Sequence, residues 1–232
     1  MKIVILCGGL GTRIGHETKY KPKPMITIDK KPIIWHVMKI YQKFGYNDFL
    51  LAAGYKNEMI KNYFKKSKEF KVKVINTGLN TNTGGRILAI KKYIKSENFF
   101  LTYGDGLSDI DINKLLKLHL KSKAIATLTA VNPPVRFGEI KFDKKKIKSF
   151  KEKPQAGIGW INGGFFVLNK KIFKYIANKK TVFEREPLSK LTKIKKLIGY
   201  KHKGFWQCMD TVRDKENLKK IIKKERLKWL NY

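Results

Sequence analysis

Near its start the chain reads Lys2-Ile-Val-Ile-Leu-Cys7, an apolar run that passes directly into Gly8-Gly-Leu-Gly-Thr-Arg13. The continuous apolar character and the β-branched side chains predict a buried parallel strand that ends in a glycine loop. Glycines allow backbone N–H groups to approach a polyphosphate closely. Ligands of open α/β sheets bind at the carboxyl ends of strands, so the loop is a candidate phosphate site.

The loop matches neither of two common phosphate-binding templates. The dinucleotide fingerprint requires a glycine at position 14, which is Ile14, and the P-loop requires a Gly-Lys-Ser/Thr ending, which is absent. A tight structural turn is the alternative interpretation. The preceding strand and Arg13, whose guanidinium can bind phosphate oxygens bidentately, favour phosphate binding, and Thr12 adds a hydroxyl donor.

Apolar periodicity predicts alternating strands and helices in the first half of the chain. Expected strands cover residues 2–7, 48–53, 71–76, 98–103 and 124–131; expected helices cover residues 32–44, 57–64, 83–94 and 113–121. Such alternation is typical of an α/β protein with a mostly parallel central sheet and helices on both faces.

The second half has a different pattern, and we expect it to complete the same domain. Expected strands cover residues 138–142, 147–150, 160–168 and 204–209; expected helices cover residues 170–176, 184–192 and 214–230. We interpret residues 1–232 as one domain, in which the second half (132–232) completes the crevice formed by the first half (1–131).

The chain is strongly basic, with 52 Lys and Arg, 18 Asp and Glu, and a formal net charge of +34. Such a charge allows a nucleic-acid-binding protein as an alternative. Only six of the basic residues are Arg, whereas base and phosphate recognition relies on Arg forks, and the lysines are scattered. We therefore expect a solvated basic surface that attracts anionic substrates, with neither nucleic acid nor membrane as partner.

Two cysteines, Cys7 and Cys208, form neither a metal-ligand spacing nor a disulfide framework. No apolar run approaches the ~20 residues of a membrane span, and we expect no leader segment before the first strand. The expected location is cytoplasmic.

Three charged residues stand out after the glycine loop. Lys23 lies in Lys21-Pro-Lys-Pro-Met25, where the prolines favour an extended segment from which a lysine could reach the phosphates. Asp105 lies between two glycines directly after a buried strand, and Asp210 follows the apolar segment 205–209. One or two carboxylates together with substrate phosphates usually hold Mg²⁺, although helix capping or a turn is the alternative for each.

These motifs resemble the glucose-1-phosphate cytidylyltransferases of the sugar-phosphate nucleotidyltransferase family. General markers are the GGLGTR loop, KPKPM (21–25) and YGDG (103–106); more specific ones are TNTGGR (81–86), WINGGFFVL (160–168), EREPL (184–188) and GFWQCMDT (204–211). The resemblance covers nearly the whole chain. It implies a Rossmann-like fold and transfer of CMP from CTP to glucose 1-phosphate, and the family's usual product, CDP-glucose, feeds surface polysaccharides such as O-antigen.

The resemblance also assigns roles by position. Arg13, Lys23, Asp105 and Asp210 would be catalytic, and the two aspartates would bind Mg²⁺. The nucleotide would be bound by Leu6, Gly8, Gly9, Leu10, Gly11, Thr12, Arg13, Lys23, Thr81, Arg86 and Gly104. The sugar phosphate would face Glu152, Lys153, Trp160, Asn162 and Gly163. For Asn162 alone, a bulged strand is an equally good interpretation.

Two departures from the family pattern concern assembly and the metal region. The segment 65–70 is shorter than in the family. Any subunit contact or nucleotide lid that the family builds from this segment would therefore differ here, and the sequence leaves open whether the protein forms a homo-oligomer. Cys208 stands where we expect proline; an inert buried thiol is favoured over a redox-sensitive one. The same chemistry with UTP, dTTP or another hexose 1-phosphate, and a non-catalytic sugar-nucleotide sensor, are the remaining alternatives.

Overall fold

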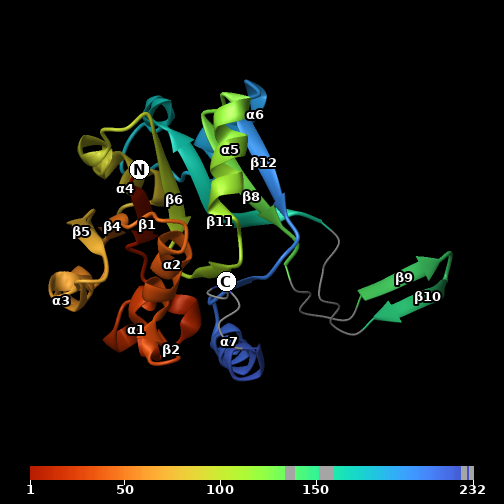
Figure 1. The fold of residues 1–232 in the computed structure, drawn as a ribbon. Coiled ribbons are helices and arrows are strands. Elements are labelled where there is room, and N and C mark those ends of the chain that lie inside the picture. The colour runs from red at the N-terminus through yellow and green to blue at the C-terminus, as the bar shows by residue number, and fades with distance from the viewer. Residues whose placement is uncertain (134–138, 152–158, 226–228, 230–232) are drawn as a thin grey trace.

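The computed structural model describes residues 1–133, 139–151, 159–225 and 229, and its centre is a seven-stranded sheet (Figure 1). The spatial order is β12-β8-β11-β6-β1-β4-β5, and every strand except β11 runs in the same direction. The strands are β1 (Ile3–Cys7), β4 (Asp48–Ala53), β5 (Lys71–Asn76), β6 (Asn98–Tyr103), β8 (Ala126–Val131), β11 (Ile161–Asn169) and β12 (Leu197–His202). The predicted mostly parallel sheet is confirmed.

Helices cover both faces of this sheet, as the alternation of strands and helices predicted. The α-helices are α1 (Glu17–Tyr20), α2 (Ile33–Gln42), α3 (Asn57–Lys65), α4 (Thr83–Ala89), α5 (Ile112–Ser122), α6 (Glu186–Lys193) and α7 (Val212–Glu225). Alternate side chains of β1 point to opposite faces: Ile3 and Ile5 join a core with α2, α3, α5 and α7, whereas Val4 and Leu6 join a core with α4 and α6. The central strands are therefore buried on both sides.

Short elements connect and extend this framework. They are β2 (Thr27–Ile28), β3 (Lys31–Pro32), β7 (Gly106–Ser108), β13 (Trp206–Cys208) and the 3₁₀ turns η1 (Thr12–Ile14), η2 (Lys23–Met25), η3 (Lys91–Tyr93) and η4 (Lys170–Tyr175). An antiparallel hairpin of β9 (Glu139–Asp143) and β10 (Lys146–Lys151) projects from the body of the molecule (Figure 1). The described helices include none long and apolar enough to cross a membrane.

Several predicted boundaries were wrong. The expected helix 83–94 ends at Ala89 and continues as 3₁₀ turn η3, and the expected helix 170–176 is the 3₁₀ turn η4. Strand β12 was missed, because Leu-Ile-Gly-Tyr-Lys-His contains a glycine and two basic residues, which an edge strand tolerates. The last helix begins at Val212 rather than 214, and its predicted end at 230 lies outside the described helix.

The connection between α3 and β5 is closely packed. Phe70 is buried and makes edge-to-face contacts with Trp35, Phe49 and Phe64. Glu69 accepts a hydrogen bond of 2.8 Å from the Trp35 indole. These contacts fix the short segment against α2 and the sheet.

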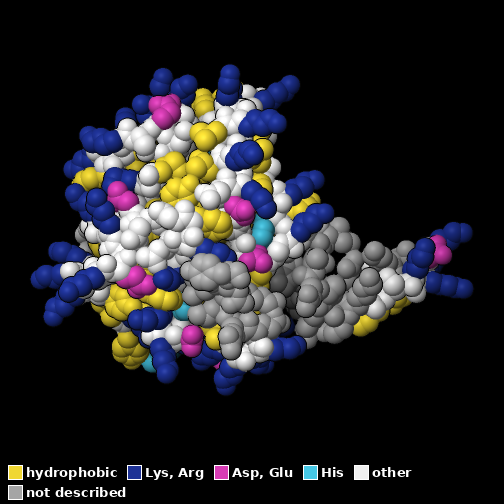
Figure 2. Space-filling model, in the orientation of Figure 1, with side chains coloured by type: hydrophobic (Ala, Val, Ile, Leu, Met, Phe, Trp, Pro, Cys, Tyr) yellow, Lys and Arg dark blue, Asp and Glu magenta, His cyan; other side chains and the backbone are white. Residues whose placement is uncertain are grey.

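Basic side chains are spread over the face shown in Figure 2, with acidic ones between them. This distribution agrees with the expected solvated basic surface.

Candidate functional site

A cavity of about 570 Å³ lies at the carboxyl ends of β1 and β6. Every residue of the predicted nucleotide-binding set lines it: Leu6, Gly8, Gly9, Leu10, Gly11, Thr12, Arg13, Lys23, Thr81, Arg86 and Gly104. Asp105 and Asp210 line it as well. The structure therefore brings the glycine loop, the lysine segment and both carboxylates to one place.

Asp105 and Asp210 converge because their segments pair directly. Asp105 follows β6 and precedes β7, and β13 pairs antiparallel with β7 in a register that places Cys208 opposite Gly106. The Met209 N–H then donates to the Asp105 carbonyl at 2.9 Å. This pairing places Asp210, the next residue, beside Asp105.

Lys23 lies between the two carboxylates. Its Nζ is 2.6 Å from Asp105 Oδ2 and 2.7 Å from Asp210 Oδ1. Burial by itself lowers the pKa of Lys23, but Asp105 and Asp210 together outweigh it and hold the pKa above its ordinary value. Lys23 is therefore charged at neutral pH.

The Lys23 segment differs in one respect from its prediction. Pro22 is extended, as expected, but Lys23–Met25 forms a single 3₁₀ turn in which the Ile26 N–H donates to the Lys23 carbonyl at 3.1 Å. Gly11 has a φ of +69° and lies so close to Lys23 that a Cβ there would be 2.8 Å from the Lys23 Cβ. A glycine at this position lets the phosphate loop pack on the lysine.

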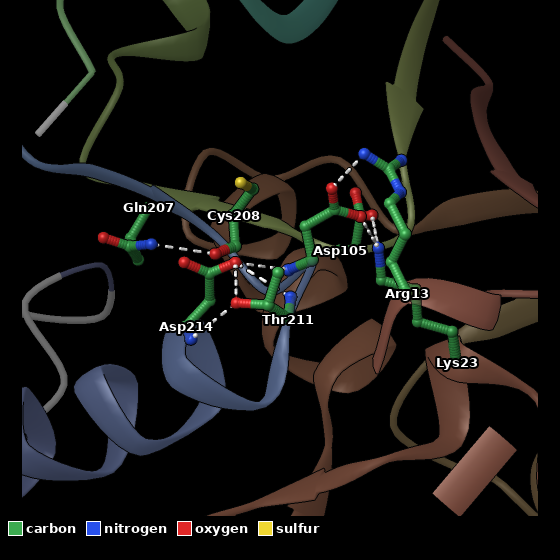
Figure 3. A network of polar contacts seen from close by, with 8 residues as sticks. Arg13, Lys23, Asp105, Gln207, Cys208, Thr211 and Asp214 are labelled. Atoms are coloured by element: carbon green, nitrogen blue, oxygen red, sulfur yellow. Dashed lines mark hydrogen bonds and ion pairs between the residues drawn. The ribbon is translucent and has the colours of Figure 1, made fainter. Parts of the chain in front are cut away.

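Arg13 extends from the glycine loop and forms an ion pair with Asp210. Figure 3 draws the network of polar contacts to which Arg13 belongs. Its side chain is 76% exposed, so the guanidinium lies at the open side of the cavity. Arg13 can therefore meet a ligand that enters the cavity from this side.

Arg86 has a structural environment that the sequence did not indicate. It is buried, and its guanidinium donates to the Gly8 carbonyl at 2.9 Å, the Gly78 carbonyl at 2.8 Å and the Thr77 hydroxyl at 2.6 Å. These bonds connect the glycine loop to the segment that carries Thr81. A direct contact between Arg86 and the nucleotide stays a prediction.

Asp214 is a further residue of this network that sequence reasoning missed. Its carboxylate accepts from the Asp210 N–H at 3.1 Å and the Thr211 N–H at 2.8 Å, while the Thr211 hydroxyl accepts from the Asp214 N–H at 3.2 Å (Figure 3). This is a capping box at the start of α7. The spacing Thr211-Val-Arg-Asp214 was the signal that could have revealed it.

Cys208 lies beside the carboxylates in β13. Burial, followed by the negative charges of Asp105, Asp214 and Asp210, raises the pKa of its thiol to about 12. A thiol with such a pKa is protonated at neutral pH, which favours the inert interpretation.

None of the predicted sugar-phosphate residues that the structure describes lines this cavity, and only Asn162 is bonded to a residue that does. The Asn162 side chain donates to the Tyr103 hydroxyl at 3.1 Å, and Tyr103 lines the cavity; the Gly163 carbonyl accepts from the Trp206 indole at 2.8 Å. Trp160 is 40% exposed and lies under the ammonium group of Lys201. Glu152 and Lys153 lie outside the described residues.

Two carboxylates that converge on one cation have the donor chemistry for Mg²⁺ completed by phosphate oxygens. Within the described chain no group of three or more His, Cys, Asp or Glu side chains could hold a metal ion. Asp105 and Asp210 fit such an ion only in combination with a ligand, and Lys23 would then have to leave its present position.

Comparison with known proteins agrees with this geometry. The sequence model for "Nucleotidyl transferase" matches residues 2–214. The chain belongs to the nucleotidyl transferase family. This nucleotidyl transferase is 42% identical to the glucose-1-phosphate cytidylyltransferase of Salmonella typhi, with 99% of this chain and 98% of that protein covered. The alignment extends over 253 positions, more than the 232 residues of this chain, so the relative carries residues that this chain lacks.

Two further comparisons involve guanine nucleotides. The D-glycero-alpha-D-manno-heptose 1-phosphate guanylyltransferase of Campylobacter jejuni is 40% identical over 76% of this chain and 80% of its own length. The crystal structure of HddC from Yersinia pseudotuberculosis complexed with GMP-PN superposes with a TM-score of 0.74 at 27% identity, covering 94% of this chain and 98% of that one. The overall fold is thus shared with the HddC structure.

Proposed function

We propose that this nucleotidyl transferase transfers CMP from CTP to α-D-glucose 1-phosphate, giving CDP-glucose and pyrophosphate. The observation that carries the reaction type is the convergence of the glycine loop, Lys23, Asp105 and Asp210 on one cavity. The 42% identity to a glucose-1-phosphate cytidylyltransferase over nearly the whole length of both chains supports the choice of base and sugar.

The reaction needs positioning and charge neutralisation rather than a general base. An oxygen of the sugar phosphate is already an anionic nucleophile, and it has to approach the α-phosphorus in line with the leaving pyrophosphate. Arg13 and the glycine loop would bind the triphosphate, and Lys23 would neutralise charge on the approaching phosphates. Thr81, Arg86 and Gly104 would bind or support the cytidine portion.

Mg²⁺ is the proposed cofactor, held by Asp105 and Asp210. When bound with the nucleotide, such an ion neutralises phosphate charge and orients the phosphates for displacement. Asp214 would keep Asp210 in place through the capping box at the start of α7. The sugar phosphate would lie against Asn162, Gly163 and Trp160, with Glu152 and Lys153 completing that half of the site.

The wider assignments rest on the same relatives. We propose residues 1–131 as the nucleotide half and residues 132–232 as the sugar-phosphate half of one domain, acting in the cytoplasm in nucleotide-sugar synthesis for surface polysaccharides. A homo-oligomer is compatible with this role, and the short connection 65–70 is where contacts would differ from the longer relatives.

Pyrophosphate release tests the proposal. Glucose 1-phosphate and Mg²⁺ are mixed with CTP, UTP, dTTP, ATP or GTP in parallel, and strong release with CTP alone is expected. Release with another nucleotide would assign a different base preference and would still support the same reaction type. GTP belongs in the panel because a guanylyltransferase is 40% identical. No release with glucose 1-phosphate or any other hexose 1-phosphate would refute the proposal.

A further inference from the structure

Four polar side chains beside the cavity form a continuous chain of hydrogen bonds. The Asn162 amide donates to the Tyr103 hydroxyl at 3.1 Å, and that hydroxyl donates to Glu184 Oε1 at 2.6 Å. The Thr83 hydroxyl donates to Glu184 Oε2, also at 2.6 Å. These residues come from β11, β6, the segment before α6 and the first residue of α4.

The direction of each hydrogen bond in this series follows from which groups can donate and which can only accept. A carboxylate only accepts hydrogen bonds, so both the Tyr103 and Thr83 hydroxyl protons point toward Glu184. The Tyr103 oxygen then has a lone pair with which it accepts from the Asn162 amide. Burial, assisted by the Glu184 charge, raises the pKa of Tyr103 well above its ordinary value, so the phenol keeps the proton that it donates.

The Asn162 amide is thereby held in one orientation. Its Nδ2 donates to Tyr103, and its Oδ1 accepts from the Gly164 N–H at 2.9 Å. The opposite orientation would place an N–H₂ group against the Gly164 donor. Asn162 is half-buried, so the second Nδ2 proton and the second lone pair of Oδ1 can serve a ligand.

Tight packing restricts movement of this pair. Gly164 has a φ of +81°, and a Cβ there would be 2.6 Å from the Tyr103 ring. On β11 the Phe166 ring meets the Tyr103 ring edge-on with centroids 6.0 Å apart. Asn162 pairs with Ala130 of β8, and the register shifts between Asn162 and Phe166, so an irregularity of the β-bulge type directly follows Asn162.

We propose that Tyr103 and Glu184 are positioning residues that orient the Asn162 amide toward a hydroxyl group of the sugar 1-phosphate. An amide that donates and accepts side by side matches a hydroxyl, which does the same. Tyr103 and Thr83 both line the nucleotide cavity, so the chain of bonds also connects the nucleotide side to Asn162. The inference rests on the proposed function, because that function supplies the sugar phosphate.

The test is a double-mutant cycle with substrate-specific readouts. Tyr103→Phe keeps the ring and removes the hydroxyl that orients Asn162, and we expect the KM for glucose 1-phosphate to rise about fivefold to tenfold, as for weakening of one or two hydrogen bonds to the sugar. The KM for CTP should stay within about twofold. Tyr63→Phe, an exposed tyrosine on α3, is the matched control and should change neither value.

The cycle separates positioning from a general structural effect. Asn162→Ala removes the amide, and adding Tyr103→Phe to it should then cause little further loss of glucose 1-phosphate affinity, because Tyr103 acts through Asn162. Glu184→Gln keeps the size of the side chain and one acceptor, so it should raise the KM for glucose 1-phosphate less than Glu184→Ala does. Fully additive losses, or equal increases in KM for both substrates, would overturn the inference.

Calorimetric titration of glucose 1-phosphate, with a non-hydrolysable CTP analogue present, repeats the cycle without turnover. Binding that weakens in Tyr103→Phe, combined with absence of pyrophosphate release in the wild type, would refute the proposed reaction and leave the positioning role intact. Binding that is unchanged in Tyr103→Phe would refute the positioning role whatever the activity of the wild type.

Discussion

The ammonium nitrogen of Lys23 lies 2.6 Å from a carboxylate oxygen of Asp105, at a point on which Asp210 also converges from 2.7 Å. The lysine thus occupies the place to which both proposed metal ligands point. A cation bound with a nucleotide would compete with Lys23 for the carboxylates, and the displaced ammonium would be free to bind phosphate oxygens. The contact therefore links the metal-binding role of the aspartates to the phosphate-binding role of the lysine.

The first prediction concerns the carboxylates. Asp105→Asn keeps the shape of the side chain but removes its charge, so binding of Mg²⁺ with the nucleotide should weaken and kcat should fall on the order of 10²- to 10³-fold, as when a charge-stabilising group is lost. Pyrophosphate release at limiting and saturating Mg²⁺ measures both effects. Asp143→Asn, at an exposed carboxylate of the β9–β10 hairpin, is the control. Near-wild-type turnover of Asp105→Asn at limiting Mg²⁺ would show that the metal assignment is wrong.

The second prediction concerns the competition at Lys23. Lys23→Met removes the internal cation and leaves two carboxylates facing one another, so the nucleotide-free variant should bind a divalent ion such as Mn²⁺ more tightly than the wild type does. Its turnover should nevertheless fall, because the phosphates lose a positive partner. Calorimetric titration of Mn²⁺ measures the first effect, and Lys21→Met on the same segment is the control. Equal Mn²⁺ affinity in wild type and Lys23→Met would contradict the competition.

The third prediction concerns Arg86. Arg86→Met leaves the buried carbonyls of Gly8 and Gly78 without their guanidinium donor, which should lower the free energy of unfolding by about 3 kcal/mol. Urea denaturation measures this loss, and Arg213→Met, at an exposed arginine of α7, should change stability by well under 1 kcal/mol. If the two variants were equally stable, the guanidinium would not be supporting the loop.

The sequence was sufficient for the central fold because its inner strands are uninterrupted apolar runs with glycine or polar residues at their ends. Ile3–Cys7 and Asn98–Tyr103 show this pattern, and the glycine loop and Asp105 follow them at the carboxyl edge. The direction of β11 is different: it inserts antiparallel between β6 and β8, and local periodicity carries no information about which way a strand runs. Leu197–His202 was missed because an edge strand lacks a continuous apolar signal.

The residues of the candidate site were likewise only partly predictable from the sequence. Lys23, Asp105 and Asp210 were predictable because strand ends and a proline frame place polar groups at one edge of the sheet. Tyr103 and Glu184 were not singled out, because their importance comes from a hydrogen bond between residues 81 positions apart. Arg86 was predicted as a nucleotide contact, and only the tertiary structure reveals that backbone carbonyls surround its guanidinium.

The last prediction concerns His119, which lies away from the nucleotide cavity and is buried in α5. Nδ1 is 2.9 Å from the Thr127 hydroxyl and Nε2 is 3.1 Å from Asn98 Oδ1, an arrangement that suits the neutral ring. Burial lowers the pKa of His119 to about 4. The unfolded chain, in which the pKa is near its ordinary value of about 6.5, therefore binds a proton more readily than the folded protein.

Stability contributed by the neutral ring is fully present above pH ~6.5 and is lost as the pH falls toward 4, by roughly 3 kcal/mol. His119→Gln has no such titration, so its deficit in unfolding free energy relative to the wild type should shrink by about that amount between pH 7 and pH 4. Urea denaturation across this range provides the measurement, with His16→Gln at an exposed histidine as the control. A deficit that stays constant with pH would mean that the folded protein protonates His119 as easily as the unfolded chain does.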